Sequence, residues 1–200
     1  MILFFTGGLK MNNRKADFDI HDVFLRRWSP RAFSEKEVTD DVLHSMFEAA
    51  RWAPSAANIQ PWQFIYAKSE EDRERFLTFI NDNNVKWCQH APVLVAVASK
   101  VTRNDAGDPN PTHAFDTGAA WGYLALEATR KGLITHGMGG FSREKAKEVL
   151  NIPDDHEVHA IIAIGYQGTL ERLDESFHER EKASDRKKLS EFISEGQFTK

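Results

Sequence analysis

Four residues within a stretch of six could bind an anion: Arg26, Arg27, Ser29 and Arg31. Arginine is always charged and presents a planar fork of donors, so several arginines beside a hydroxyl suit a phosphate group. The same residues could instead form a solvated basic loop that pairs with the acids a few positions downstream. Residue type alone leaves both interpretations open.

A second candidate, residues 53–62, leads from a predicted helix into a predicted strand through small and amide side chains. Such a loop exposes backbone groups at a sheet edge, where small ligands often bind. A plain connection with Trp62 in the core is the alternative.

A third candidate is the glycine-rich segment 136–142, which stands directly before a predicted helix. Glycine permits positive φ and lets backbone N–H groups approach a planar or anionic ligand closely. The segment lacks the GxGxxG spacing of dinucleotide-binding loops, so by itself it is weak evidence for a nucleotide site.

Capping residues and apolar repeats at helical spacing predict the helices that position these segments. Ser69 and Asp72 form a capping box for the second helix, and the asparagines of segment 81–84 end it. Gly132 is the expected C-cap of the third. The four predicted helices run from Thr39 to near Pro54, from Ser69 to Ile80, from His113 to Lys131 and from Ser142 to Leu150.

The third helix has a side of small residues, which predicts close packing in the core or against a partner subunit. These residues are Gly118, Ala119, Gly122 and Ala125.

Short apolar runs predict strands at residues 63–67, 92–99 and 158–165. The second run is valine-rich without polar alternation, which is typical of a strand buried on both faces in the middle of a sheet. Residues 169–200 carry too few apolar side chains for a core of their own, so they need a surface to lie on. Helices alternating with strands indicate an α+β or α/β sheet protein.

Composition favours a folded soluble protein, with 41% hydrophobic residues among 200 and a net charge of -4. That charge offers no general attraction to nucleic acid or to an acidic membrane surface. The apolar start is too short for a secretion signal or a membrane span, and Met11 could be the true start. We therefore expect a flexible extension over residues 1–19 and a single domain over residues 20–200.

The lone Cys88 rules out an internal disulfide, which predicts a reducing cytoplasm as the protein's location. Cys88 itself is expected to be a small buried hydrophobe. Four histidines show no metal-ligand spacing, so no metal is predicted. They are His113, His136, His156 and His159, of which His136 flanks the glycine-rich segment and could contact a substrate.

The chain closely resembles the nitroreductase family in four segments, in the right order and spacing. These are Arg-Trp-Ser-Pro-Arg-Ala-Phe at 27–33, Ala-Pro-Ser-Ala-Ala-Asn-Ile-Gln-Pro-Trp at 53–62, Gly-Gly-Phe at 139–141 and Arg-Lys-Lys-Leu at 186–189. The resemblance implies a nitroreductase-like α+β fold with a central, mainly antiparallel sheet flanked by helices. It also implies an intertwined homodimer, a C-terminal tail that reaches the partner subunit, and FMN at the subunit interface.

The resemblance assigns roles by position. Arg27 and Arg186 would bind the FMN phosphate, and Ser29 and Arg31 would reach the ribityl chain and the pyrimidine edge. Arg31 would stabilise reduced flavin electrostatically, and no catalytic acid or base is required because the cofactor supplies the hydride chemistry.

Further positions complete the expected site. The loop of Pro54, Ser55 and Ala56 would pack on the flavin from the other subunit, Asn84 would lie against the pyrimidine ring, and Gly139 and Gly140 would face flavin N5. The full expected set is Arg27, Trp28, Ser29, Arg31, Pro54, Ser55, Ala56, Asn58, Asn84, Gly139, Gly140 and Arg186.

Two positions depart from the commoner family pattern. Trp28 stands where many members have a basic residue, so its indole is expected to pack and not to contact phosphate, and Lys188 replaces a frequent proline.

The activity implied is reduction of a small organic acceptor by NADH or NADPH, through ping-pong hydride transfer at flavin N5. The acceptor would be a nitroaromatic, a quinone or an enone, with no nucleic-acid or membrane partner. A dehalogenase, a flavin-cleaving enzyme and a non-catalytic FMN-binding or flavin-storage protein remain alternatives. An interaction domain that uses the basic segment 180–188 is disfavoured because acids are interspersed there.

Overall fold

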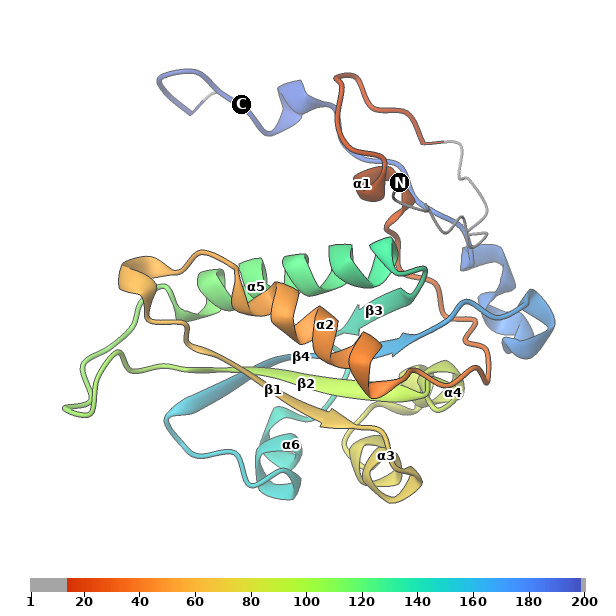
Figure 1. Cartoon of the computed structure of the whole chain (residues 1–200), viewed down its shortest axis with the longest axis horizontal. Helices are drawn as coiled ribbons and strands as arrows, with labels where there is room; N and C mark the ends of the chain where they lie inside the picture. Colours follow the sequence, from red (N-terminus) through yellow and green to blue (C-terminus); the bar gives the residue numbers. More distant parts are fainter. Residues whose placement is uncertain (1–13, 199–200) are drawn as a thin grey trace.

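The computed structural model describes residues 14–198, and the predictions for residues 1–13, including Met11 as the start, lie outside this part. A sheet lies between two layers of helices (Figure 1). None of the helices in residues 14–198 has both the length and the apolar character needed to cross a bilayer. The helices are α1 (Val23–Arg26), α2 (Asp40–Arg51), α3 (Glu70–Leu77), α4 (Asp82–Cys88), α5 (His113–Arg130) and α6 (Arg143–Val149).

The sheet has the strand order β1-β2-β4-β3, and each neighbouring pair is antiparallel. Its strands are β1 (Trp62–Ala67), β2 (Val93–Lys100), β3 (Ile134–Met138) and β4 (His156–Gly165). Strand β2 lies between β1 and β4 and is buried up to Ser99, which confirms the predicted central strand. The arrangement is α+β with an antiparallel sheet, as the resemblance implied.

Alternate residues of β2 face two separate cores. Val93 and Val95 pack under α2 and α5, together with Leu43 and Leu124. The neighbouring residues of β2 face α3, α4 and α6 on the other side (Figure 1). Because side chains of a strand alternate in direction, a run of apolar residues buries both faces of the sheet.

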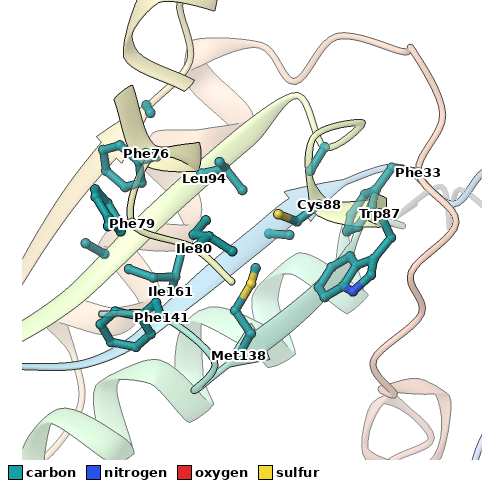
Figure 2. Close-up of a cluster of buried hydrophobic side chains, with 14 of the residues drawn as sticks. Phe33, Phe76, Phe79, Ile80, Trp87, Cys88, Leu94, Met138, Phe141 and Ile161 are labelled. Carbon is teal, nitrogen blue, oxygen red and sulfur yellow. The ribbon is translucent and has the colours of Figure 1, made fainter. Parts of the chain in front are cut away.

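The second core contains Cys88, shown in Figure 2 beside Trp87 and Phe33. The rings of Trp87 and Phe33 stack with centroids 6.3 Å apart. Cys88 is fully buried, and this burial raises the pKa of its thiol to about 12. The expectation of a small buried hydrophobe is confirmed.

Two of the predicted helix caps are confirmed in detail. The Ser69 hydroxyl accepts a hydrogen bond from the backbone N–H of Asp72, and Ser142 does the same for Lys145. Thr39 precedes α2 as predicted, but its side chain makes no capping hydrogen bond. Gly132 follows α5 with φ of +80°, the left-handed conformation expected of a C-terminal cap.

The second helix ends before Asn81, as predicted, but it stops at Leu77, and the sequence did not predict the helix that follows. Asn81 is the N-cap of a new helix, α4, which continues to Cys88. The Asn81 side chain makes no capping hydrogen bond, and the burial of Trp87 and Cys88 stabilises the helix.

The first part of the glycine-rich segment 136–142 forms a strand that the sequence did not predict. His136, Gly137 and Met138 belong to strand β3, which pairs with β4, and the turn begins only at Gly139. The backbone hydrogen bonds to β4 hold a glycine-containing strand that local propensity disfavours.

The C-terminal segment lies partly on the body of the protein. Leu173 and Phe177 are buried in the second core. Leu173 directly follows a short 3-10 helix at Leu170–Arg172, and Phe177 lies within a second one at Glu175–Arg180. Beyond them the chain passes α1 and extends away from the sheet (Figure 1). This last stretch exposes Phe192 and Ile193, so the predicted need for a supporting surface is met only in its first half.

Candidate functional site

Three arginines from distant parts of the sequence form the basic end of the candidate site. Arg27, at the C-terminal end of α1, is half-buried. Burial lowers the pKa of Arg27, and the nearby charges of Arg186 and Arg14 lower it further. Such repulsion between like charges indicates a cluster of positive charge at which an anion would be stabilised.

Arg14 links the N-terminal segment to the C-terminal tail at this basic cluster. Its guanidinium donates hydrogen bonds to the backbone carbonyls of Arg27 and Ser184, each at 2.8 Å. The sequence analysis missed Arg14 because it lies in a polar stretch thirteen residues before Arg27, with no motif around it. Its place is set by the tail, a long-range contact that local patterns do not reveal.

The alternative of a basic loop paired with downstream acids does not fit this geometry. Glu35 pairs with Arg172 and Glu37 with Lys68. Arg26, which the sequence grouped with the anion site, instead forms an ion pair with Asp22. The Arg27 guanidinium makes a weak contact of 3.5 Å with the Ser29 hydroxyl, so these two predicted residues do lie together.

Arg31 lies further along the same segment and is held by Glu181 from the C-terminal tail. One oxygen of Glu181 accepts hydrogen bonds from the backbone N–H groups of Arg31 and Ala32, at 2.7 and 3.0 Å. The other oxygen lies 3.8 Å from the Arg31 guanidinium, and within the described chain it is buried without a hydrogen-bond partner. Burial lowers the pKa of Arg31 and Arg180 lowers it further, whereas Glu181 raises it.

His136 connects the sheet to this segment. Its Nδ1 lies 3.0 Å from the carbonyl oxygen of Pro30, and its ring packs on Trp87 with centroids 4.5 Å apart. Burial, opposed by this hydrogen bond and reinforced by Arg31, lowers the pKa of His136 to about 4. The imidazole is therefore neutral at pH 7, and its Nδ1–H donates to the carbonyl.

Asn84 forms a hydrogen bond with Gly140. The Asn84 side-chain amide donates to the Gly140 carbonyl at 3.2 Å, and the backbone N–H of Asn81 donates to the same oxygen at 3.0 Å. A Cβ at position 140 would fall 2.7 Å from the Asn84 amide nitrogen, so only glycine fits without movement. Gly139 beside it is exposed.

The predicted loop around residues 54–58 lies elsewhere. It follows α2 at the end away from α4, far from α1 in this chain (Figure 1). Its backbone is fixed: the N–H of Ala56 donates to buried Asp116 at 3.1 Å, and Ala57, Asn58 and Gln60 have positive φ. One chain therefore brings together part of the predicted set and leaves Pro54, Ser55, Ala56 and Asn58 apart from it.

Comparison with known proteins shows the family of the chain. The family model described as the nitroreductase family matches residues 25–86 and 79–166. The chain belongs to the nitroreductase family. This confirms the family inferred from the four sequence segments.

Relatives of this nitroreductase-family chain cover most of its length. A Rhodopseudomonas palustris protein, provisionally named NADH dehydrogenase/NAD(P)H nitroreductase, is 28% identical over 82% of this chain and 92% of its own. A crystal structure described as an oxidoreductase containing FMN is 41% identical, covers 96% of this chain and 99% of its own, and superposes with a TM-score of 0.90. A nitroreductase family protein from Clostridium difficile is 23% identical and has a TM-score of 0.70 over 90% of this chain and all of its own, which shows the shared fold.

Proposed function

We propose that the protein is an FMN-dependent oxidoreductase that uses NADH or NADPH to reduce a small organic acceptor. The observation that carries this proposal is the set of groups that one chain offers to a ligand. They are the arginine cluster of Arg14, Arg27 and Arg186, then Arg31 beside Trp87, and the contact of Asn84 with Gly140. A phosphate, a polar linker and a planar ring would meet suitable partners in that order.

The arginine cluster fits the phosphate of FMN. Beyond the larger effect of burial, the charge of Arg186 lowers the pKa of both Arg27 and Arg14, and a phosphate dianion would remove that repulsion. Arg27 and Arg186 are the proposed phosphate ligands, and Ser29 is placed to hold the ribityl chain.

The groups around Asn84 and Gly140 fit a flat ring. Exposed Gly139 leaves its backbone accessible, Asn84 supplies an amide beside Gly140, and the Arg31 guanidinium lies 6.0 Å from the Trp87 ring centroid. When bound, FMN would supply the hydride chemistry, by accepting hydride at N5 from NAD(P)H and passing it to the acceptor in a ping-pong cycle. Arg31 would stabilise the negative charge that FMN gains on reduction. Neutral His136 would hold in place the segment that carries Arg31.

The protein would act as a homodimer, because the loop of residues 54–58 can contribute to a flavin site only on a second chain. Pro54, Ser55, Ala56 and Asn58 cannot reach the Arg27 end of their own chain, but a partner's loop could cover it. The outer side of α5 supports this: Phe115 is 81% exposed, and an added Cβ at Gly118 or Gly122 would meet nothing within 4 Å. We place this dimer in the cytoplasm, as one domain over residues 20–200.

The proposed acceptors are nitroaromatics, quinones and enones, in line with the nitroreductase names of the relatives. An anaerobic titration of the purified protein with NADH and NADPH, followed by flavin absorbance, tests cofactor and donor together. We expect about one FMN per chain to bleach and then to recover its colour when a quinone or a nitroaromatic is added. A flavin that stays oxidised would indicate a storage protein, and a colourless protein that takes up no FMN would refute the proposal.

A further inference from the structure

A cluster of two histidines and a glutamate lies at the end of the sheet from which α5 begins, outside the arginine site. His113 is the first residue of α5, and Glu157 and His159 lie near the start of β4. One nitrogen or oxygen atom of each lies within 4.8 Å of those of the other two. The sequence predicted no metal because these residues lack a ligand spacing, but the fold brings them together.

We propose that His113, Glu157 and His159 form a binding site for a divalent transition-metal ion of the zinc type. Two imidazoles and one carboxylate are the protein ligands of a frequent zinc arrangement that leaves one position for water. In a tetrahedral zinc site neighbouring ligand atoms are about 3.4 Å apart, so a modest closure of the cluster is required. Glu157 can provide it, because its side chain is 53% exposed.

A β-bulge turns His159 toward the cluster. Val97 of β2 pairs with Ala160 and the next residue, Ala98, pairs with Val158, so His159 is an additional residue in the ladder. Bulges redirect side chains and occur often beside functional sites. A regular strand would not have placed His159 against the start of α5 in this way.

Ser99 holds both rings in position. Its fully buried hydroxyl oxygen lies 2.7 Å from Nδ1 of His113 and 2.7 Å from Nε2 of His159. If both rings donate N–H to this oxygen, which has two lone pairs, the nitrogens left for a metal are Nε2 of His113 and Nδ1 of His159. Metal-ligating histidines usually have such an oxygen partner, which fixes their orientation.

The charges around the cluster act in both directions. The second ring nitrogen of His113, Nε2, lies 3.9 Å from a Glu157 oxygen. The Glu157 carboxylate would attract a bound cation, whereas Arg143, whose charge acts on His159, would repel it. Glu157 therefore offsets the repulsion that Arg143 would exert.

Cobalt(II) is a suitable probe, because its d–d absorbance in a tetrahedral site appears at longer wavelengths than oxidised flavin absorbs. Untagged protein with its native flavin content is freed of metal with a chelator and titrated with Co²⁺, and Zn²⁺ is then added. We expect saturation at about one Co²⁺ per chain and loss of the signal when Zn²⁺ displaces it. Failure of the wild-type protein to bind either ion would overturn the proposal.

Matched variants locate the site. His113→Gln and His159→Gln should abolish the signal, whereas His156→Gln, on the same strand but bonded to Asp155, should retain it. If the histidine variants fold poorly, exposed Glu157→Gln should still weaken binding by about tenfold or more. If all three ligand variants bound Co²⁺ with wild-type affinity, or if His156→Gln lost as much affinity as they do, the ion would bind elsewhere.

Discussion

Glu181 and Arg31, separated by 150 residues, form a clamp between the C-terminal tail and the candidate flavin site. The carboxylate fixes the Arg31 backbone through a 2.7 Å hydrogen bond and lies 3.8 Å from its guanidinium. The Glu181 side chain is only 5% exposed, so solvent screens this pair little. The positive charge that Arg31 offers to a ligand is therefore partly neutralised.

Glu181→Gln should raise the midpoint potential of the bound flavin. The amide oxygen can still accept the backbone hydrogen bonds, but the negative charge beside Arg31 is lost, which favours reduced flavin. We expect a rise of about 30 mV or more by dye equilibration, where 30 mV corresponds to about 1.4 kcal/mol for two electrons. Exposed Glu179→Gln is the control, and equal potentials in the two variants would count against the clamp.

Arg31→Gln should change the potential in the opposite direction. Removing the cation disfavours the negative charge that flavin gains on reduction, so the potential should fall and reduction by NAD(P)H should slow. The same dye equilibration measures it. Weak FMN binding with an unchanged potential of the remaining bound flavin would contradict this role for Arg31.

Arg27→Ala and Arg186→Ala should chiefly weaken FMN binding. A charge-assisted hydrogen bond to phosphate contributes about 1.5 to 3 kcal/mol, so each loss should raise the dissociation constant by about tenfold or more. Fluorescence titration of the FMN-free protein measures it. Arg172→Ala, which removes a partner of Glu35 instead, should leave affinity unchanged. If Arg186→Ala binds FMN normally, the tail does not reach the phosphate.

His136 should make the free energy of unfolding depend on pH. Its pKa is about 4 in the folded chain, against an ordinary value of 6.5, so its contribution is complete above pH 6.5 and lost as pH falls toward 4. The effect amounts to at most about 3 kcal/mol. Urea unfolding at pH 7 and pH 5 should show a smaller difference in His136→Gln than in wild type, while exposed His90→Gln should match wild type.

Gly140→Ala should destabilise the protein, and Gly139→Ala should not. The new methyl group at 140 would fall 2.7 Å from the Asn84 amide nitrogen and 3.3 Å from that of Asn81, whereas at 139 it meets nothing within 4 Å. Overpacking typically costs about 1 to 3 kcal/mol. Urea unfolding of the FMN-free variants measures this, and equal stability would show that Asn84 moves aside freely.

The parts of the fold that the sequence predicted are those fixed by local rules. Ser69 and Ser142 cap their helices through backbone groups three residues away, and the valine-rich β2 is buried on both faces. Strand β3 was missed because pairing with β4, and not local propensity, stabilises a segment containing Gly137. Helix α4 was missed because its asparagines disfavour a helix, while its tertiary contacts stabilise it.

The candidate site likewise has residues that the sequence predicted and residues that it did not. Arg27, Ser29 and Arg31 lie close together in the sequence, so their motif was visible, and the family resemblance added Asn84, Gly140 and Arg186. Glu181 and Arg14 had no such signal. Each acts through backbone atoms of a distant segment, which a pattern of residue types does not record.

Because Cys88 is buried, thiol reagents can be used on this protein without interference from its native cysteine. With the thiol pKa raised to about 12 and the side chain fully enclosed, maleimides and spin-label reagents should leave the folded wild-type chain unlabelled. A cysteine introduced on the exposed tail, for example Ser190→Cys, would then be the sole reactive thiol. Spin labels there would report whether two tails lie within measurable range of each other in solution.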